Sequence, residues 1–186
     1  MKSIEEIIDA CFPDRNMMRS YYITHVESVT KKALAICDRN PHLRADRNLV
    51  EAAAMLHDIG ICRVFAPEIG CYGDAPYIQH GILGAEIVRR EGRDEIAPFC
   101  ENHIGVGITE ADIVNYRLAL PKRNMSPQTV EQKIVAFADK FFSKSQNHLA
   151  TPKSIEKIHT SLLRYGVEKI AIFNQWCELF GENLSN

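Results

Sequence analysis

Apolar side chains recur at steps of three and four residues along most of this chain, which is the period of helices that bury one face. Sustained alternation of apolar and polar residues, the pattern of a half-buried strand, is not found. Capping residues, glycines and prolines mark where each periodic stretch begins and ends. The pattern predicts helices at about 3–11, 20–39, 46–60, 77–91, 94–103, 110–117, 127–141, 154–165 and 167–180.

Two segments interrupt the helical pattern. Residues 60–76 and 104–126 both contain prolines and glycines, so both are predicted to be largely loop. Ser3 and Glu6 have the spacing of a capping box and predict the start of the first helix. Ser126, which precedes a proline, is expected to cap the helix that follows the second loop. The sequence therefore predicts an all-α helical bundle of about seven to nine helices.

Composition and charge narrow the classes of function. The 186 residues are 46% hydrophobic and 25% charged, as expected for one globular domain, 1–186. A formal net charge of −2 gives no positive field for nucleic acid or anionic membranes, so neither is expected as a partner. A small anionic substrate would need local cations or a bound metal.

The expected location is the cytoplasm. The N-terminal residues do not resemble a signal peptide, and no apolar stretch approaches the roughly 20 residues that span a bilayer. The six cysteines are scattered without a C-x-x-C pair, which favours reduced thiols over disulfides or metal ligands. Oligomeric state stays open.

An ordered set of histidines and aspartates carries the candidate chemistry. Imidazole and carboxylate together suit one or two divalent transition-metal ions such as Fe, Mn, Co, Ni or Zn. A helical bundle can direct such side chains from several helices to one point in its core. The set consists of His25, His57, Asp58, His80, His103 and Asp139.

Each member also has a simpler interpretation. An isolated His-Asp pair is usually exposed, Asp139 could form a structural salt bridge, and His25 alone is more often a packed core histidine. The pair His57-Asp58, however, ends an apolar helix, where a buried carboxylate would need a partner. His42, His148 and His159 lie outside the set, and we expect surface or packing roles for them.

The order H…HD…D, with the pair inside H-D-I-G, resembles the HD-domain superfamily of metal-dependent phosphohydrolases, in its HDIG-type branch. The resemblance covers roughly residues 20–145, to which helices at 154–180 would be added, and it implies an all-α fold. It implies that one metal is held by His25, His57, Asp58 and Asp139. In two-metal members, positions matching His80 and His103 hold a second ion, which the aspartate of the pair bridges.

The resemblance further implies hydrolysis of a nucleotide or another small phosphate ester or diester, with Asp58, His80 and His103 at the reacting centre. Some members carry an extra histidine, or a lysine soon after the pair; here Asn102 precedes His103, and Arg63 takes the place where the lysine would be expected. Candidate cations for the substrate phosphate are Lys140, Arg63, Lys122 and Arg123. Two alternatives remain open, a mononuclear nucleotidase-like phosphomonoesterase and a non-catalytic regulatory HD-like module.

Overall fold

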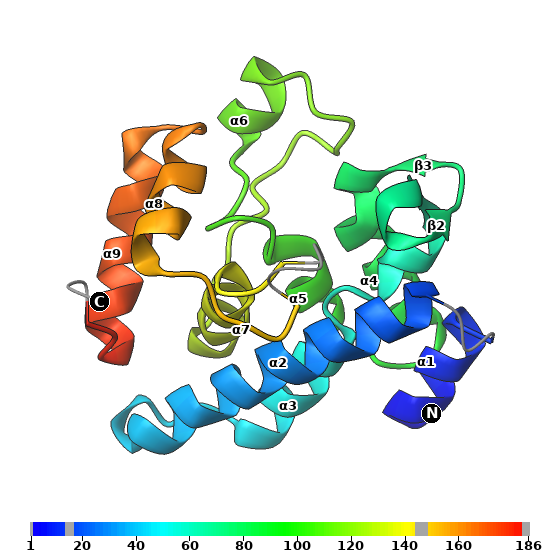
Figure 1. The fold of residues 1–186 in the computed structure, drawn as a ribbon, viewed down its shortest axis with the longest axis horizontal. Helices are drawn as coiled ribbons and strands as arrows, with labels where there is room; N and C mark the ends of the chain where they lie inside the picture. The colour runs from blue at the N-terminus through cyan, green and yellow to red at the C-terminus, as the bar shows by residue number, and fades with distance from the viewer. Residues whose placement is uncertain (1, 14–16, 144–148, 184–186) are drawn as a thin grey trace.

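The computed structural model describes residues 2–13, 17–143 and 149–183. These residues form nine α-helices and one small sheet, shown in Figure 1. The prediction of an all-α fold is confirmed. The helices are α1 Ile4–Cys11, α2 Met17–Arg39, α3 Arg47–Leu56, α4 His80–Arg90, α5 Ala97–Asn102, α6 Glu110–Asn115, α7 Val130–Lys140, α8 Ile155–Leu163 and α9 Val167–Phe180.

Side-chain caps explain where several helices begin. Ser3 and Glu6 form the predicted capping box at α1. Asp46 accepts hydrogen bonds from two backbone N–H groups of the first turn of α3. The prediction that Ser126 caps α7 is wrong, because its hydroxyl donates to an asparagine two residues earlier. Thr129 takes its place and accepts from the backbone N–H three residues on.

The core is organised around α2, the long helix that crosses the lower half of Figure 1 and packs along α3 and against α7. Buried alanines on the three helices, among them Ala33, Ala53 and Ala136, let their backbones approach closely. The buried Tyr22 hydroxyl of α2 donates to the Met55 carbonyl of α3 over 2.6 Å. This packing fixes the end of α3, where the His-Asp pair follows.

A small sheet lies within the segment predicted to be loop. The strands β1 Val64–Ala66, β2 Cys71–Tyr72 and β3 Ala75–Pro76 are ordered β2-β1-β3. β1 pairs antiparallel with β2 and parallel with β3. The prediction of a loop missed these strands, because two or three residues are too few to show an alternating pattern. The sheet connects the end of α3 to the start of α4.

The C-terminal helices α8 and α9 lie on the opposite side of the molecule from α1 (Figure 1). The ring of Phe137 on α7 stacks on Phe173 of α9 with centroids 5.2 Å apart, and Phe180 lies 5.1 Å from the same ring. All three side chains are fully buried.

Among the described residues, none of the helices combines the length and apolar character that a bilayer crossing requires. All six cysteines are free thiols.

Candidate metal centre

The side chains predicted as metal ligands come from separate parts of the fold and converge in its core. His25 lies on α2, the His57-Asp58 pair follows α3, His80 begins α4, His103 follows α5 and Asp139 lies near the end of α7. Their exposed fractions are between 0% and 9%. They form two overlapping sets, which we name the first ligand group (His25, His57, Asp58 and Asp139) and the second ligand group (Asp58, His80 and His103).

In the first ligand group, two carboxylates face two imidazoles. Nε2 of His25 lies 3.1 Å from Oδ2 of Asp58 and 3.1 Å from Oδ1 of Asp139. Nε2 of His57 lies 3.4 Å and 3.7 Å from the same two oxygens. Neither ring nitrogen of His25 has a hydrogen-bond partner, although the ring is buried. The nitrogens and oxygens therefore surround a common point instead of bonding in pairs.

In the second ligand group, His80 and His103 face the other oxygen of Asp58. Their Nε2 atoms each lie 3.3 Å from Oδ1 of Asp58 and 3.1 Å from one another. Asp58 thus contributes one carboxylate oxygen to each group.

Backbone carbonyls fix how the histidine rings are oriented. Nδ1 of His80 lies 2.7 Å from the Tyr77 carbonyl, and Nδ1 of His103 lies 2.8 Å from the Cys100 carbonyl. Because a carbonyl only accepts, Nδ1 must donate, and in the neutral ring Nε2 then carries a lone pair. When both rings are neutral, two lone pairs face one another over 3.1 Å, and a cation between them would remove their repulsion. His57 is anchored in the same way, with Nδ1 2.8 Å from the Ala54 carbonyl.

The donor set fits one or two divalent transition-metal ions. With metal–ligand bonds of about 2.0–2.2 Å, neighbouring ligand atoms lie roughly 2.8–3.6 Å apart. The nitrogen–oxygen distances given above and the distance between His80 and His103 run from 3.1 to 3.7 Å, and all ligand atoms of each group lie within 4.8 Å of one another. Mixed nitrogen and oxygen donors suit Fe, Mn, Co, Ni or Zn, whereas Mg and Ca prefer oxygen alone.

The pKa values reflect two buried carboxylates surrounded by imidazoles. Burial alone would lower the pKa of His57, but the Asp58 and Asp139 carboxylates outweigh it and raise the pKa to about 9. Burial likewise lowers the pKa of His103, and there the hydrogen bond to Asp58 does not compensate. Burial would raise the pKa of Asp139, but Lys140 and then His25 hold it well below its usual range.

A close backbone approach places the two groups side by side. A Cβ atom on Gly60 would lie 2.0 Å from the His80 carbonyl oxygen and 2.4 Å from the backbone nitrogen of Gly84. Only a residue without a side chain fits there. The turn that carries Asp58 can therefore lie directly on the start of α4.

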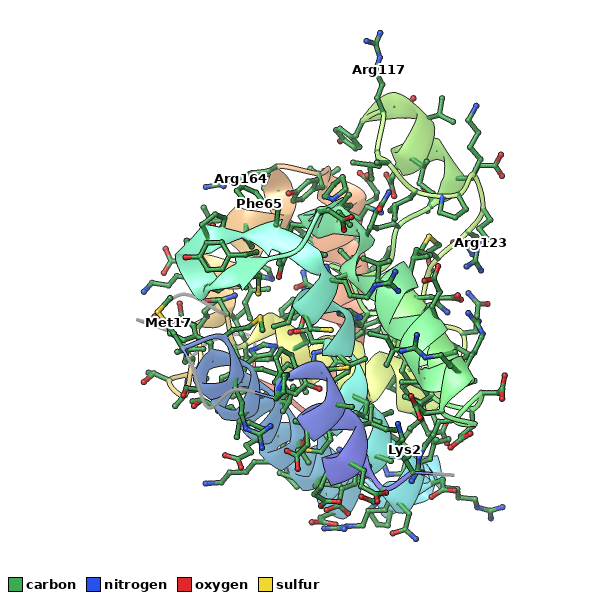
Figure 2. The ribbon with its side chains drawn as sticks, turned by 90° about the vertical axis from the view of Figure 1, so that its right-hand side faces the viewer. Lys2, Met17, Phe65, Arg117, Arg123 and Arg164 are labelled. Carbon is green, nitrogen blue, oxygen red and sulfur yellow. The ribbon has the colours of Figure 1, made fainter. Side chains whose placement is uncertain are left out.

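Of the predicted phosphate cations, Lys140 lies beside the ligand groups, with Nζ 3.1 Å from Oδ2 of Asp139. Arg63 is about half exposed and pairs with Glu86 over 2.9 Å. Arg123 pairs with Glu101 over 3.1 Å and lies at the edge of the molecule in Figure 2. Lys122 is exposed in the loop before it. These three are therefore surface cations, unlike Lys140.

The histidines outside the set are placed as follows. His42 is exposed, and the half-buried His159 bonds Asn174 through Nε2 over 2.7 Å. These positions agree with the expected surface and packing roles. His148 lies outside the described residues.

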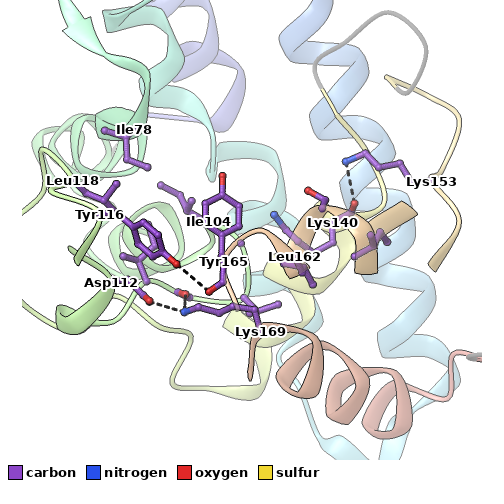
Figure 3. Close-up of a pocket in the computed structure, with 16 residues that line it drawn as sticks. Ile78, Ile104, Asp112, Tyr116, Leu118, Lys140, Lys153, Leu162, Tyr165 and Lys169 are labelled. Atoms are coloured by element: carbon purple, nitrogen blue, oxygen red, sulfur yellow. Dashed lines mark hydrogen bonds and ion pairs between the residues drawn. The ribbon is translucent and has the colours of Figure 1, made fainter. Parts of the chain in front are cut away.

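A cavity of about 370 Å³ next to this centre is lined by Lys140 and otherwise by residues that the sequence analysis did not single out (Figure 3). Lys169 of α9 lies at its floor, where it is buried and donates to Asp112 over 2.5 Å and to the Gly107 carbonyl over 3.0 Å. One signal could have indicated its burial, since Lys169 shares a helix face with Phe173 and Trp176. Nothing in the sequence indicated which segment it would meet.

Comparisons with known proteins agree with this fold and with the order of the ligands. A model of the HD domain family matches residues 22–143. A tRNA (cytidine(56)-2'-O)-methyltransferase of Thermoplasma volcanium is 38% identical over 152 residues, which cover 81% of this chain and 40% of that protein. An uncharacterised protein of Methanocaldococcus jannaschii is 37% identical over 128 residues, or 67% of this chain and 68% of that protein. The chain thus spans less than half the length of the methyltransferase.

Solved structures show the same fold. The HD domain of the L. monocytogenes phosphodiesterase PgpH superposes with a TM-score of 0.54 over 95% of both chains, at 18% sequence identity. The same domain in complex with cyclic-di-AMP also gives 0.54, over 93% of this chain and 92% of that one. At this identity the likeness concerns the fold, whereas the family match extends over the ligand positions from His25 to Asp139. The chain belongs to the HD-domain family.

Proposed function

We propose that this protein is a metal-dependent phosphohydrolase that cleaves a small phosphate ester with a metal-activated water. The observation that carries the proposal is the position of Asp58, whose two oxygens face the two ligand groups separately. A carboxylate shared in this way suits a pair of neighbouring metal ions. The match to the HD domain family supports the same reading.

The first ligand group would hold one ion, and the second would hold another through Asp58, His80 and His103. Divalent ions at such a site supply Lewis-acid polarisation of a phosphoryl oxygen and make water acidic enough to attack near neutral pH. All six ligands are buried, so bulk water is kept away from their charges. The electrostatic attraction between these charges and a bound ion is therefore stronger than it would be in water. The backbone-anchored rings hold their Nε2 atoms in place without reorganisation.

Lys140 would meet the substrate phosphate. Its ammonium group pairs with Asp139 over 3.1 Å. A cation bound by Asp139 would compensate that carboxylate and leave the Lys140 ammonium available for a phosphoryl oxygen. Its position beside the first ligand group and on the wall of the cavity supports this role.

The substrate is proposed to be a small molecule, and a nucleotide in particular. The net charge of −2 disfavours a polyanionic nucleic acid. The PgpH domain, which shares the fold, has been solved with cyclic-di-AMP, a nucleotide. The mononuclear phosphomonoesterase remains the nearest alternative; in it His80 and His103 would position substrate or transfer protons.

Metal content and turnover test the proposal together. We expect the purified, metal-loaded protein to bind two ions per chain by elemental analysis and to release phosphate, or a phosphorylated product, from part of a panel of phosphomonoesters and phosphodiesters. Asp58→Ala should lose both ions, and turnover should fall by at least about 100-fold. His80→Ala should lose one ion. His159→Ala, a histidine outside both groups, is the matched control and should keep both.

Each alternative gives a different result. One ion in the wild-type protein, retained in His80→Ala, would support the mononuclear enzyme. Bound metal without turnover of any ester would favour a regulatory module. Full activity in Asp58→Ala would exclude the proposed centre altogether.

A further inference from the structure

The cavity in Figure 3 is lined by Lys140 and Ile104, the chain neighbours of Asp139 and His103, and has two chemically different parts. At one end stand Lys140, which bonds Asp139, and Lys153, which donates to the Lys140 carbonyl over 3.3 Å. The other part is formed mostly by apolar side chains, among them Ile78, Ile104 and Leu118. Ile104 directly follows His103, so the apolar wall begins at the second ligand group. A ligand that fills the cavity would be anionic at one end and apolar at the other.

Two tyrosines stand at this cavity although much of each ring is exposed. Tyr116 and Tyr165 are 48% and 53% exposed, and their rings lie edge to face with centroids 6.1 Å apart. The Tyr116 hydroxyl donates a hydrogen bond to the backbone carbonyl of Tyr165 over 3.4 Å. This bond does not involve the Tyr165 ring. Figure 3 shows this ring between Tyr116 and Lys140. An exposed aromatic face at the mouth of an apolar cavity is suited to stacking on a flat ligand.

We propose that this cavity is the nucleoside subsite of the enzyme and that its substrate is a nucleoside monophosphate. The base packs between the Tyr165 ring and the apolar wall, and the phosphate points to Lys140 and the ligand groups. This inference rests on the proposed phosphohydrolase function and specifies its substrate. Water attacks phosphorus, the bond from phosphorus to the ester oxygen breaks, and the nucleoside leaves with a proton on that oxygen as inorganic phosphate forms.

The cavity's chemistry separates a nucleoside from other phosphate esters. A sugar phosphate has no flat apolar face to set against Ile78, Ile104 and Leu118, which offer no hydrogen bonds. A hydrocarbon chain would lie against the buried Lys169–Asp112 ion pair at the floor of the cavity and could form no hydrogen bond with either side chain. A base has both an apolar face for the wall and polar edges for such groups.

The cavity's size indicates one nucleoside. About 370 Å³ lies near the lower end of the roughly 300–1,000 Å³ that ligand sites enclose. One base with its ribose fits this space, whereas the second nucleoside of a cyclic dinucleotide would remain outside it. The preferred reaction is therefore cleavage of a monoester.

Kinetics on the metal-loaded protein test this inference. We expect KM for at least one of the four common ribonucleoside 5′-monophosphates to be at least tenfold below KM for ribose 5-phosphate, and cyclic-di-AMP to be cleaved more slowly than either. Tyr165→Ala should raise KM for the nucleotide at least about fivefold, the lower limit for loss of one base–aromatic stack, with little change for ribose 5-phosphate. Tyr165→Phe keeps the ring and should restore the wild-type KM. Tyr72→Ala, an exposed tyrosine on β2 outside the cavity, is the matched control.

Calorimetry adds a measurement that does not need turnover. A phosphonate analogue of the preferred nucleotide, in which a methylene group replaces the ester oxygen, should bind Tyr165→Ala at least fivefold more weakly than the wild-type protein. Equal binding to both, or equal KM for nucleotide and ribose 5-phosphate, overturns the nucleoside subsite while leaving the phosphohydrolase intact. Failure to hydrolyse any monoester or diester overturns the proposed function itself, and with it the inference.

Discussion

Binding of a divalent ion to the metal-free protein should displace close to one proton from His57 near neutral pH. Burial alone would lower the pKa of this imidazole, but the carboxylates of Asp58 and Asp139 raise it to about 9. Near neutral pH the metal-free protein therefore holds His57 as an imidazolium. A histidine must be neutral at the ligating nitrogen to bind a metal, so this proton has to leave.

The pKa sets the size of the effect. Below about pH 9, the apparent affinity for the ion should rise about tenfold per pH unit, and above that pH the His57 contribution should level off. His103 behaves differently, because burial lowers its pKa below that of an ordinary histidine and leaves it neutral near pH 7. Deprotonation of His103 should therefore add nothing to the metal affinity of the second ligand group between about pH 7 and 9.

The same pKa shift has a consequence for stability. The pKa of His57 is higher in the folded metal-free protein than in the unfolded chain, where it is about 6.5. Its contribution to stability is then fully present below about pH 6.5 and is lost as the pH rises through 9. The difference in Tm between metal-loaded and metal-free protein should accordingly widen over this interval.

Isothermal titration calorimetry measures the displaced proton directly. Titrations of the metal-free protein with Zn²⁺ or Mn²⁺, in two buffers of different ionisation enthalpy at one pH, give the number of protons released. The His57 contribution should be close to one near pH 7 and close to zero above about pH 10. His103→Ala is the matched variant and should keep it. Ion binding without proton release, and with an affinity independent of pH between about 7 and 9, would refute this account of His57.

The remaining predictions concern packing near the centre. Gly60→Ala should lower the free energy of unfolding by about 3 kcal/mol, because its Cβ would lie 2.0 Å from a backbone oxygen. Gly92→Ala, which has a positive φ of 76° but open space, should cost about 1 kcal/mol, and thermal unfolding of the two variants distinguishes blocked space from backbone strain. Lys169→Met should cost about 2 kcal/mol by denaturant unfolding, because Asp112 loses a buried charged partner; an unchanged midpoint would contradict that role.

Local chemistry in the sequence was sufficient to predict most of the helices. The capping box of Ser3 and Glu6 and the cap at Asp46 depend only on residues within four positions of one another, and both are present. The starts of α2 and α4 differ by three residues from the prediction, because tertiary packing and a 3₁₀ turn, which periodicity does not distinguish, move helix ends. The sheet within 64–76 had no local signal.

The candidate metal ligands could be predicted from the sequence, because their order along the chain is informative. The residues of the cavity could not, because their positions depend on how distant segments dock. The six candidate ligands were predicted from their order along the chain, from acids placed in apolar stretches, as Asp139 is, and from the family resemblance. The cavity residues Lys169 and Asp112 lie 57 positions apart, and their pairing follows from how α9 docks against α6. Lys153 and Tyr165 are ordinary surface residues by every sequence measure, and only the fold brings them together at the cavity.

The turn after α3 explains why four successive residues matter to this centre. His57 and Asp58 supply ligand atoms, Ile59 is fully buried and holds the turn to the core, and Gly60 allows the backbone to touch the start of α4. That contact involves the carbonyl of His80, which is a member of the second ligand group and the first residue of α4. A displacement of the turn would therefore move both oxygens of Asp58 relative to His80. The two ligand groups are thus linked through backbone packing as well as through the shared carboxylate, and a change at Gly60 should disturb both at once.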